Sequence, residues 1–140
     1  MAEQNDEQQF QAITLLRDQL LPNLLGNDIK DILYWAGKEL ARKSPSEDEA
    51  SLFSKFEQNG FGELTFVNEK KQTREYVLSG EIIEARLNKN ESVSFSLEAG
   101  FLAQQLQDIH QLFTEAIFEV KPKKKQVYLY IQTDPKEPIL

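Results

Sequence analysis

The chain has 140 residues, a formal net charge of −7, and 40% hydrophobic against 28% charged side chains. This balance is typical of one globular domain, and the negative charge argues against nucleic-acid binding, which needs a positive field. The absence of cysteine excludes disulfides, thiolate metal sites, thiol nucleophiles and S-acylation. The polar, acidic N-terminus is unlike a signal peptide, and no apolar run approaches the roughly 18 residues of a membrane span. We therefore expect a soluble, cytoplasmic protein with no membrane insertion.

Apolar residues recur at helical spacing over residues 10–25 and predict a first helix. Its stripe contains Phe10, Ile13, Leu16, Leu20 and Leu24. Pro22 should kink this helix or end it near Leu20, because the residue before a proline avoids the helical region. Gly26 then supplies a C-terminal cap.

A second helix is expected to begin at Asn27 or Asp28, either of which can cap it. Its apolar positions follow the i, i+3, i+4, i+7 pattern and are Ile29, Ile32, Leu33, Ala36, Gly37, Leu40 and Ala41. A mid-helix glycine is less favourable than alanine by about 1 kcal/mol. Gly37 lies within the stripe beside other small residues, so we expect another backbone to pack closely against it.

Trp35 differs from the rest of this helix, because it falls roughly 140° from the centre of the apolar stripe. The single tryptophan of the chain should point away from the core. It is either covered by another segment or used at an interface. Since buried aromatic anchors dominate interfaces, we take Trp35 as the candidate interface residue.

A third helix is predicted after Pro45, with Ser46 and Glu49 as a capping box and Asn59-Gly60 at its end. The pattern then changes to alternation and predicts a hairpin over 61–80 with its turn at 68–72. The segment EIIEARL (81–87) is predicted as a third strand.

A fourth helix begins near Ser94 or Ser96 and runs through LEAGFLAQQLQDI. Gly100, between small residues, predicts a close crossing with the helix that contains Gly37. A second hairpin follows, with alternating apolar residues on both sides of KPKKK (121–125). The sequence thus predicts one α+β domain over 1–140, with flexible tails at 1–8 and 134–140.

No catalytic motif is present. His110, the single histidine, lacks the partners of a catalytic triad or a metal site, so a structural role near a helix C-terminus is favoured. The carboxylates that flank the isoleucines at 82–83 and 117 are expected on solvated faces, and the lysines at 121–125 are interpreted as protection against edge-to-edge aggregation rather than a phosphate site. No catalytic, cofactor-binding or metal residue is assigned.

The aromatic side chains leave two interpretations open, a packed core or an apolar pocket between helices and sheet. The candidate pocket walls are Tyr34, Phe56, Phe66, Tyr76 and Phe101.

The stretches LLPNLLGNDIKDILYWAGKELARK, GFGELTFVNEKK and SFSLEAGFLAQQLQ resemble the YslB-like family of uncharacterised proteins from low-GC Gram-positive bacteria (Firmicutes), over nearly the whole chain. At fold level the family resembles 4-vinyl reductase domains, TRAPP vesicle-tethering subunits and heme nitric-oxide sensors. The resemblance implies a helical N-terminal half packed on an antiparallel sheet with an inserted helix. Gly37 and Gly100 occupy the positions of the glycines that this group carries in its second and inserted helices.

Members of that wider group bind lipophilic or planar ligands in an internal cavity or dimerise through their helices. This chain lacks the cysteine of acylated TRAPP subunits and the histidine with a following YxSxR motif of the heme sensors. The resemblance therefore implies no cofactor and a non-enzymatic module that binds a small lipophilic ligand noncovalently or mediates protein interaction, with a homodimer as one form. The alternative is a carboxylate-based enzyme on a small substrate.

Overall fold

The computed structural model describes residues 2–90 and 92–138, with side chains placed for 7–90 and 92–136. The helical elements, including a π-helical segment η1 and two short 3-10 turns η2 and η3, are α1 (Ala2–Thr14), η1 (Leu15–Leu20), α2 (Leu21–Leu25), η2 (Gly26–Asp28), α3 (Ile29–Lys43), α4 (Glu49–Gln58), α5 (Glu81–Lys89), α6 (Ser96–His110) and η3 (Pro122–Lys124). The strands are β1 (Glu63–Lys70), β2 (Thr73–Ser79), β3 (Leu112–Lys121) and β4 (Gln126–Pro138).

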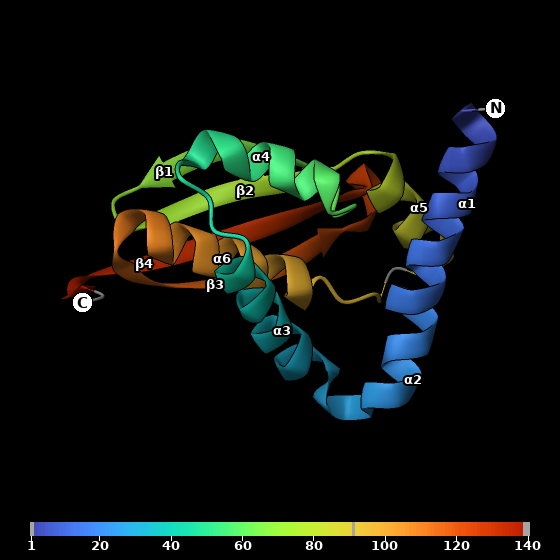
Figure 1. Cartoon of the computed structure of the whole chain (residues 1–140), viewed down its shortest axis with the longest axis horizontal. Coiled ribbons are helices and arrows are strands. Elements are labelled where there is room, and N and C mark those ends of the chain that lie inside the picture. The colour runs from blue at the N-terminus through green and yellow to red at the C-terminus, as the bar shows by residue number, and fades with distance from the viewer. Residues whose placement is uncertain (1, 91, 139–140) are drawn as a thin grey trace.

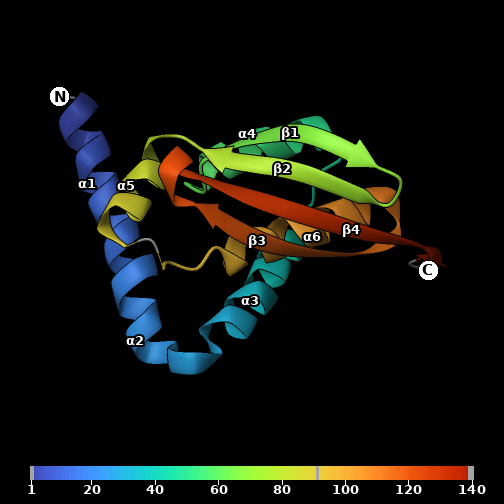
Figure 2. The ribbon, with the colours of Figure 1, turned by 180° about the vertical axis from the view of Figure 1, so that it is seen from behind.

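The four strands form one antiparallel sheet in the order β1-β2-β4-β3. Helices α4 and α6 cover one face, and the opposite face is open toward the viewer in Figure 2. The chain begins as a long helical arm, which comprises α1, η1 and α2, and α3 returns from its end toward the sheet. The arm and α3 together form a V in Figure 1. This arrangement is the α+β architecture that the sequence predicts.

The core lies between the sheet and the covering helices. Alternate residues of each strand point inward, and the rings of Phe56, Phe61 and Phe101 meet edge to face with centroids 5.3–5.6 Å apart. Such T-shaped contacts are the favoured geometry of aromatic pairs. The interior is therefore filled at this point.

Helices α3 and α6 cross with almost no space between their backbones. A Cβ atom added to Gly37 would overlap the carbonyl oxygen of Leu97, and one added to Gly100 would overlap that of Tyr34. Only glycine fits at both points. The crossing fixes the direction in which α3 leaves the core.

The segment 81–87 is the helix α5 and not the predicted strand, so that prediction is wrong. Ile82, Ile83, Arg86 and Leu87 are buried and follow the i, i+1, i+4, i+5 spacing of one helix face. The two adjacent isoleucines favour a strand locally, but a short apolar run is ambiguous between the two structures. Gly80, with φ of 107°, ends β2 and lets the chain turn into the helix.

Pro22 does not end the first helical stretch at Leu20. The chain takes π-helical geometry over η1, in which the N–H of Leu21 donates to the carbonyl of Leu16, and Pro22 lies in the first turn of α2. At that position a missing N–H and a fixed φ are tolerated. Gly26, with φ of 60°, then breaks the helix as expected.

Two local predictions also change. Asp48, not Ser46, caps α4, because its carboxylate accepts from the N–H of Ser51 at 3.0 Å. The turn of the first hairpin is shorter than the predicted 68–72, since β1 continues to Lys70 through an irregularity between Phe66 and Asn68. The predicted flexible tails at 1–8 and 134–140 overlap α1 over residues 2–8 and β4 over 134–138, and their flexibility stays a prediction.

Candidate functional site on the helical arm

Large apolar side chains are exposed on the arm and on α3, the two helical parts that form the V of Figure 1. Between residues 15 and 40 the exposed set is Leu15, Leu16, Leu20, Leu24, Ile32, Trp35 and Leu40. Leu24 and Trp35 are the most exposed, at 69% and 62%. Where such residues adjoin one another, the exposed apolar surface typically marks an interaction site. We call these seven residues the apolar arm surface.

The arm carries two different apolar faces. Phe10 and Ile13 pack against the core, whereas Leu16, Leu20 and Leu24 point outward. The sequence combined these five residues into one stripe, as a regular α-helix would require. The π-helical segment η1 begins after Ile13 and contains Leu16 and Leu20. Its wider turn changes the side-chain direction relative to a regular α-helix, so the second half of the stripe faces solvent.

Trp35 lies on the outer side of α3, opposite Leu33, Gly37 and Ala41, which are buried. The position follows from helical geometry, because the buried stripe and Trp35 are more than a third of a turn apart. The indole therefore presents its surface to solvent, as the sequence predicts.

Tyr34, the neighbour of Trp35, joins α3 to the edge strand β3. Its hydroxyl accepts a hydrogen bond from the N–H of Ala116 at 3.0 Å and donates to the carboxylate of Glu115. Lys38 places its Nζ 3.2 and 3.3 Å from the two oxygens of Glu115 and 4.7 Å from the centroid of the Tyr34 ring. Burial and the contact with Glu115 raise the pKa of Tyr34 above its usual value. The hydroxyl thus stays protonated and donates to Glu115, while its oxygen accepts the N–H of Ala116 on the edge strand β3.

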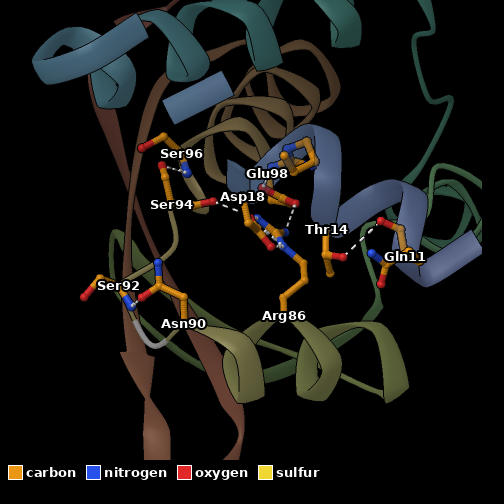
Figure 3. A network of polar contacts seen from close by, with 10 residues as sticks. Gln11, Thr14, Asp18, Arg86, Asn90, Ser92, Ser94, Ser96 and Glu98 are labelled. Carbon is orange, nitrogen blue, oxygen red and sulfur yellow. Dashed lines mark hydrogen bonds and ion pairs between the residues drawn. The ribbon is translucent and has the colours of Figure 1, made fainter. Parts of the chain in front are cut away.

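A buried group of charged residues fastens the arm to the core, and Figure 3 shows most of it. The side chain of Arg86, on α5, is 1% exposed and bonds the carboxylate of Asp18 at 2.8–3.2 Å and that of Glu98 at 3.0 Å. Arg17 contacts the other oxygen of Glu98 at 2.7 Å. We call Arg17, Asp18, Arg86 and Glu98 the ionic cluster.

Further contacts hold Arg86 in place. Its guanidinium donates to the carbonyl of Ser94 at 3.0 Å and lies 4.2 Å from the centroid of the Phe95 ring. Three helical segments therefore meet at one side chain, namely η1, α5 and the start of α6. An arginine suits this place because its planar fork serves several acceptors at once.

The electrostatics of the ionic cluster favour its charged form. Burial alone would raise the pKa of Glu98, but the neighbouring Arg17 and Arg86 outweigh it and hold that pKa below its usual value. The pKa of Arg86 is likewise raised by Glu98 and Asp18 against the opposing effect of burial. A carboxylate kept ionised between two guanidinium groups is unsuited to proton transfer near neutral pH, so the cluster is an attachment and not an acid–base pair.

Sequence reasoning missed the ionic cluster. The sequence analysis gave no role to Arg17 or Asp18, and it placed Arg86 in a strand. The available signal is the position of Arg86 among Ile82, Ile83 and Leu87, which share one face if the segment is a helix. An arginine on an apolar helix face indicates a buried charge that requires partners, but the segment was predicted as a strand. The partners lie 68 and 12 residues away from Arg86 in the sequence, and no local pattern connects them.

The structure places the five predicted pocket residues at three different points. Phe56 and Phe101 belong to the packed core, with ring centroids 5.6 Å apart. Phe66 and Tyr76 form a second pair at 5.5 Å, in which Tyr76 is buried and Phe66 is 43% exposed. Tyr34 borders a separate surface depression of about 230 Å³ beside β3. The packed-core interpretation fits these contacts better than the pocket interpretation.

The remaining polar candidates are dispersed. His110 ends α6 and places its Nε2 3.1 Å from Glu49 Oε1 at the surface. Glu119 is paired with Lys121 at 2.8 Å and accepts from the hydroxyl of Tyr130 at 2.9 Å. Among the residues that the structure describes, no group of three or more acidic, histidine or cysteine side chains is placed to hold a metal ion. Over the same residues, none of the helices combines the length and the apolar character needed to cross a membrane.

Comparison with solved structures identifies the fold. A vinyl-4-reductase family protein of Methanocaldococcus jannaschii superimposes with a TM-score of 0.61 at 19% identity, over 73% of this chain and 68% of that chain. Subunit 3 of the trafficking protein particle complex of Naegleria fowleri, solved covalently bound to palmitic acid, gives a TM-score of 0.59 at 13% identity over 99% of both chains. The protein therefore has the α+β fold shared by the vinyl-4-reductase and TRAPP proteins, as the sequence resemblance predicts.

Sequence comparison identifies the family. The family described as protein of unknown function (DUF2507) matches residues 10–132. The chain is also 41% identical over 128 residues to the uncharacterized protein YslB of Bacillus subtilis (strain 168), which covers 91% of this chain and 86% of that protein. The chain belongs to the DUF2507 family, and the predicted YslB-like membership is confirmed.

Proposed function

We propose that this protein is a non-enzymatic protein-interaction module whose contact site is the apolar arm surface. One observation carries the proposal: seven large apolar side chains of residues 15–40 are between 39% and 69% exposed. The elements that bear them are nevertheless anchored to the core, α3 by its close crossing with α6 at Gly37 and Gly100, and the arm by the ionic cluster. A rigidly held apolar surface lowers the entropic cost of association. Trp35 is the anchor residue of this surface, since tryptophan is enriched at interface hot spots.

The charge pattern of α3 supports a second copy of the chain as the partner. Asp28, the N-cap residue of α3, and Arg42, which is paired with Glu39 on the same helix, are both exposed and lie seven residues before and after Trp35. That separation is about 10 Å on each side of the indole at 1.5 Å per residue. In an antiparallel contact of two α3 helices centred on Trp35, Asp28 faces Arg42 of the partner subunit, and the reciprocal pair forms as well. The same alignment brings Asp31 opposite Glu39 of the partner subunit, a like-charge contact that the two Asp28–Arg42 pairs must outweigh. Reciprocal pairs of this kind are what a twofold dimer requires.

The test is sedimentation velocity of the wild-type chain and of Trp35→Ala over a range of concentrations. We expect a concentration-dependent dimer for the wild type and at least a tenfold weaker association for the variant. The thermal midpoint should change little, because Trp35 is 62% exposed and contributes little to the monomer core.

Val67→Ala is the matched control, since Val67 is 49% exposed but lies on β1, away from the arm. It should leave sedimentation unchanged. If Trp35→Ala and Val67→Ala sediment like the wild type, the apolar arm surface is not the dimer contact and the proposal fails.

A second candidate function is noncovalent binding of a small lipophilic ligand. It is favoured by the likeness, over 99% of both chains, to a TRAPP subunit that carries palmitic acid. Because this chain has no cysteine, a thioester is excluded and any such ligand would be held by apolar contacts alone. Native mass spectrometry beside the denatured mass separates the two functions: excess mass lost on denaturation supports a ligand, and a clean dimer mass supports the interaction module.

The proposal assigns no catalysis and a cytoplasmic location. A carboxylate-based enzyme, the alternative, requires acidic groups that converge on a cleft with their pKa values driven apart. Glu49, Glu115 and Glu119 are each paired with a different basic residue, His110, Lys38 and Lys121. These separate pairs support the non-enzymatic proposal instead. Fractionation of cells that express a tagged chain tests the location.

A further inference from the structure

The open face of the sheet carries two regular rows of side chains that run across all four strands. The register places Asn68, Glu75, Tyr130 and Ile117 in one row and Lys70, Thr73, Gln132 and Glu115 in the next. Directly paired residues of antiparallel strands share a face, so each row forms a line of neighbouring side chains. Figure 2 views the molecule from this side, where no helix covers the strands.

A depression of about 410 Å³ lies on these two rows. It is bordered by all eight row residues and by Arg74, Ala116 and Ile131, which lie between them in the sequence. The side chains of those three turn to the other face, since Arg74 contacts Glu49 on α4 while Ala116 and Ile131 are buried in the core. The strand backbones therefore form the floor, and the row side chains form the walls. The volume is within the range of small-molecule sites, about 300–1,000 Å³.

Tyr130 lies at the centre of the depression, between acidic groups. Its hydroxyl donates to Oε1 of Glu119 at 2.9 Å, and Glu75 is its neighbour on β2 in the same row. Partial burial, the bond to Glu119 and the charge of Glu75 together raise the pKa of Tyr130. The phenol therefore stays neutral, and the ring presents an electron-rich face with carboxylates on both sides.

The charges around Tyr130 leave one carboxylate for a ligand. Glu115 is paired with Lys38, and Glu119 with Lys121. Among the side chains that the structure places, Glu75 has no lysine, arginine or histidine partner within 4 Å. Lys70 contributes a positive charge to the second row, so the attraction for a cation comes from the first row, where the carboxylate of Glu75 lies beside the aromatic face of Tyr130.

We propose that this depression binds a small organic cation, an ammonium or guanidinium group attached to an apolar body. The cationic group contacts the carboxylate of Glu75 and the ring of Tyr130, and the apolar body lies on Ile117, whose side chain is 63% exposed. The amides of Asn68 and Gln132 flank this position. Oδ1 of Asn68 accepts from the N–H of Glu69 at 2.8 Å, which leaves its Nδ2 to donate to the ligand. The site is independent of the apolar arm surface, which lies on the arm and on α3.

The experiment is a titration of the full chain, labelled with nitrogen-15, with phenethylammonium chloride. The matched probe is 2-phenylethanol, which has the same aromatic body and chain length but no charge. We expect saturable amide shifts confined to the two rows of β1, β2, β4 and β3 with the cation. The neutral probe should bind at least fivefold more weakly, and added salt should weaken only the cation.

Two variants test the residues. Glu75→Gln and Tyr130→Leu should each weaken phenethylammonium binding at least fivefold, while Glu84→Gln, a matched change of an exposed carboxylate on α5, should have no effect. Tyr130→Leu changes a residue of the sheet and can prevent folding. If Tyr130→Leu does not fold, the binding result of Glu75→Gln alone decides the proposal. Equal binding of the neutral probe, shifts elsewhere, or no saturable shift would each overturn the proposal. Trp35→Ala should leave this titration unchanged, so its outcome is separate from that of the dimer.

Discussion

Arg86 is the side chain on which attachment of the arm depends. It brings together Asp18 of η1 and Glu98 of α6, and both carboxylates are nearly or fully buried. Replacing such a group by apolar residues of similar volume is often neutral, whereas removing one partner is expensive, because a charge is left buried without compensation. The ionic cluster is therefore best understood as a device that specifies one position of the arm, and single changes within it should be severe.

Glu98 gives a prediction on the dependence of stability on pH. Its pKa in the folded chain lies below the usual value, so its contribution is present above the unfolded pKa of about 4.3 and is lost as pH falls through the folded pKa. We expect Glu98→Gln to lower the free energy of unfolding at pH 7 by about 3–5 kcal/mol, the usual effect of breaking a buried ion pair. The difference from the wild type should shrink below about pH 4.3.

Urea denaturation at several pH values between 7 and 3 measures this difference. Glu84→Gln is the control, because Glu84 is exposed on α5, and it should track the wild type throughout. A gap between Glu98→Gln and the wild type that stays constant down to pH 3 would show that the carboxylate of Glu98 is not held by its charge.

At the scale of elements, helix α3 is fixed on two sides. Its small-residue stripe crosses α6 at Gly37, and its other side is joined to the edge strand β3 by Tyr34 and Lys38. Gln107 of α6 adds a similar contact, since its side-chain oxygen accepts from the N–H of Thr114 at 3.2 Å. Side chains from two helices thus occupy backbone groups of β3 that another strand could otherwise bind, which protects a sheet edge from unwanted pairing.

Tyr34→Phe tests the contact between α3 and β3. The variant keeps the ring but leaves the N–H of Ala116 and the carboxylate of Glu115 without the hydroxyl, so we expect a loss of about 1–2 kcal/mol in the free energy of unfolding. The amide hydrogen of Ala116 should exchange faster with solvent, while amides in the centre of the sheet keep their protection. Hydrogen exchange followed by NMR measures both effects. Tyr128→Phe, whose hydroxyl has only a 3.5 Å contact with Lys124, serves as the control and should change neither; unchanged exchange at Ala116 in Tyr34→Phe would refute the edge-capping role.

At the scale of the whole molecule, two surfaces of different character lie on different elements. One is the apolar arm surface, and the other is the open face of the sheet with its carboxylates around Tyr130. The core between them is packed with edge-to-face aromatic rings. Both proposed contacts therefore lie on the outside of a filled domain.

The proposed dimer predicts a charge-reversal pair. Asp28→Arg alone should weaken self-association at least tenfold, because it would face Arg42 of the partner subunit. The double variant Asp28→Arg with Arg42→Asp should recover most of the loss, since opposite charges again face each other. Sedimentation equilibrium measures both, and Glu57→Lys, a reversal at an exposed position of α4, is the control. Failure of the double variant to recover association would reject the antiparallel arrangement.

Much of the fold was accessible from the sequence because it depends on local spacing. The stripe of α3, the exposure of Trp35, the close packing implied by Gly37 and Gly100, and the alternation of both hairpins follow from the geometry of single helices and strands. The family resemblance supplied the order of these elements in space. The strand predicted at 81–87 was wrong, because a run as short as EIIEARL satisfies both periods and only its packing under β2 and β4 selects the helix.

The sequence by itself determined the α+β class, the family, and the exclusion of thiol chemistry, since these depend on composition and on periods of two and 3.6 residues. Only the tertiary structure decided where the first helix changes direction, that Phe56 and Phe101 fill the core while Phe66 and Tyr34 lie elsewhere, and that Arg86 meets Asp18 across 68 residues. It also aligned Glu75 with Tyr130 on one row of the sheet. The physical reason is that ion pairs and sheet register join residues distant in the chain, and their partners are set by packing of the whole molecule and not by neighbours in the sequence.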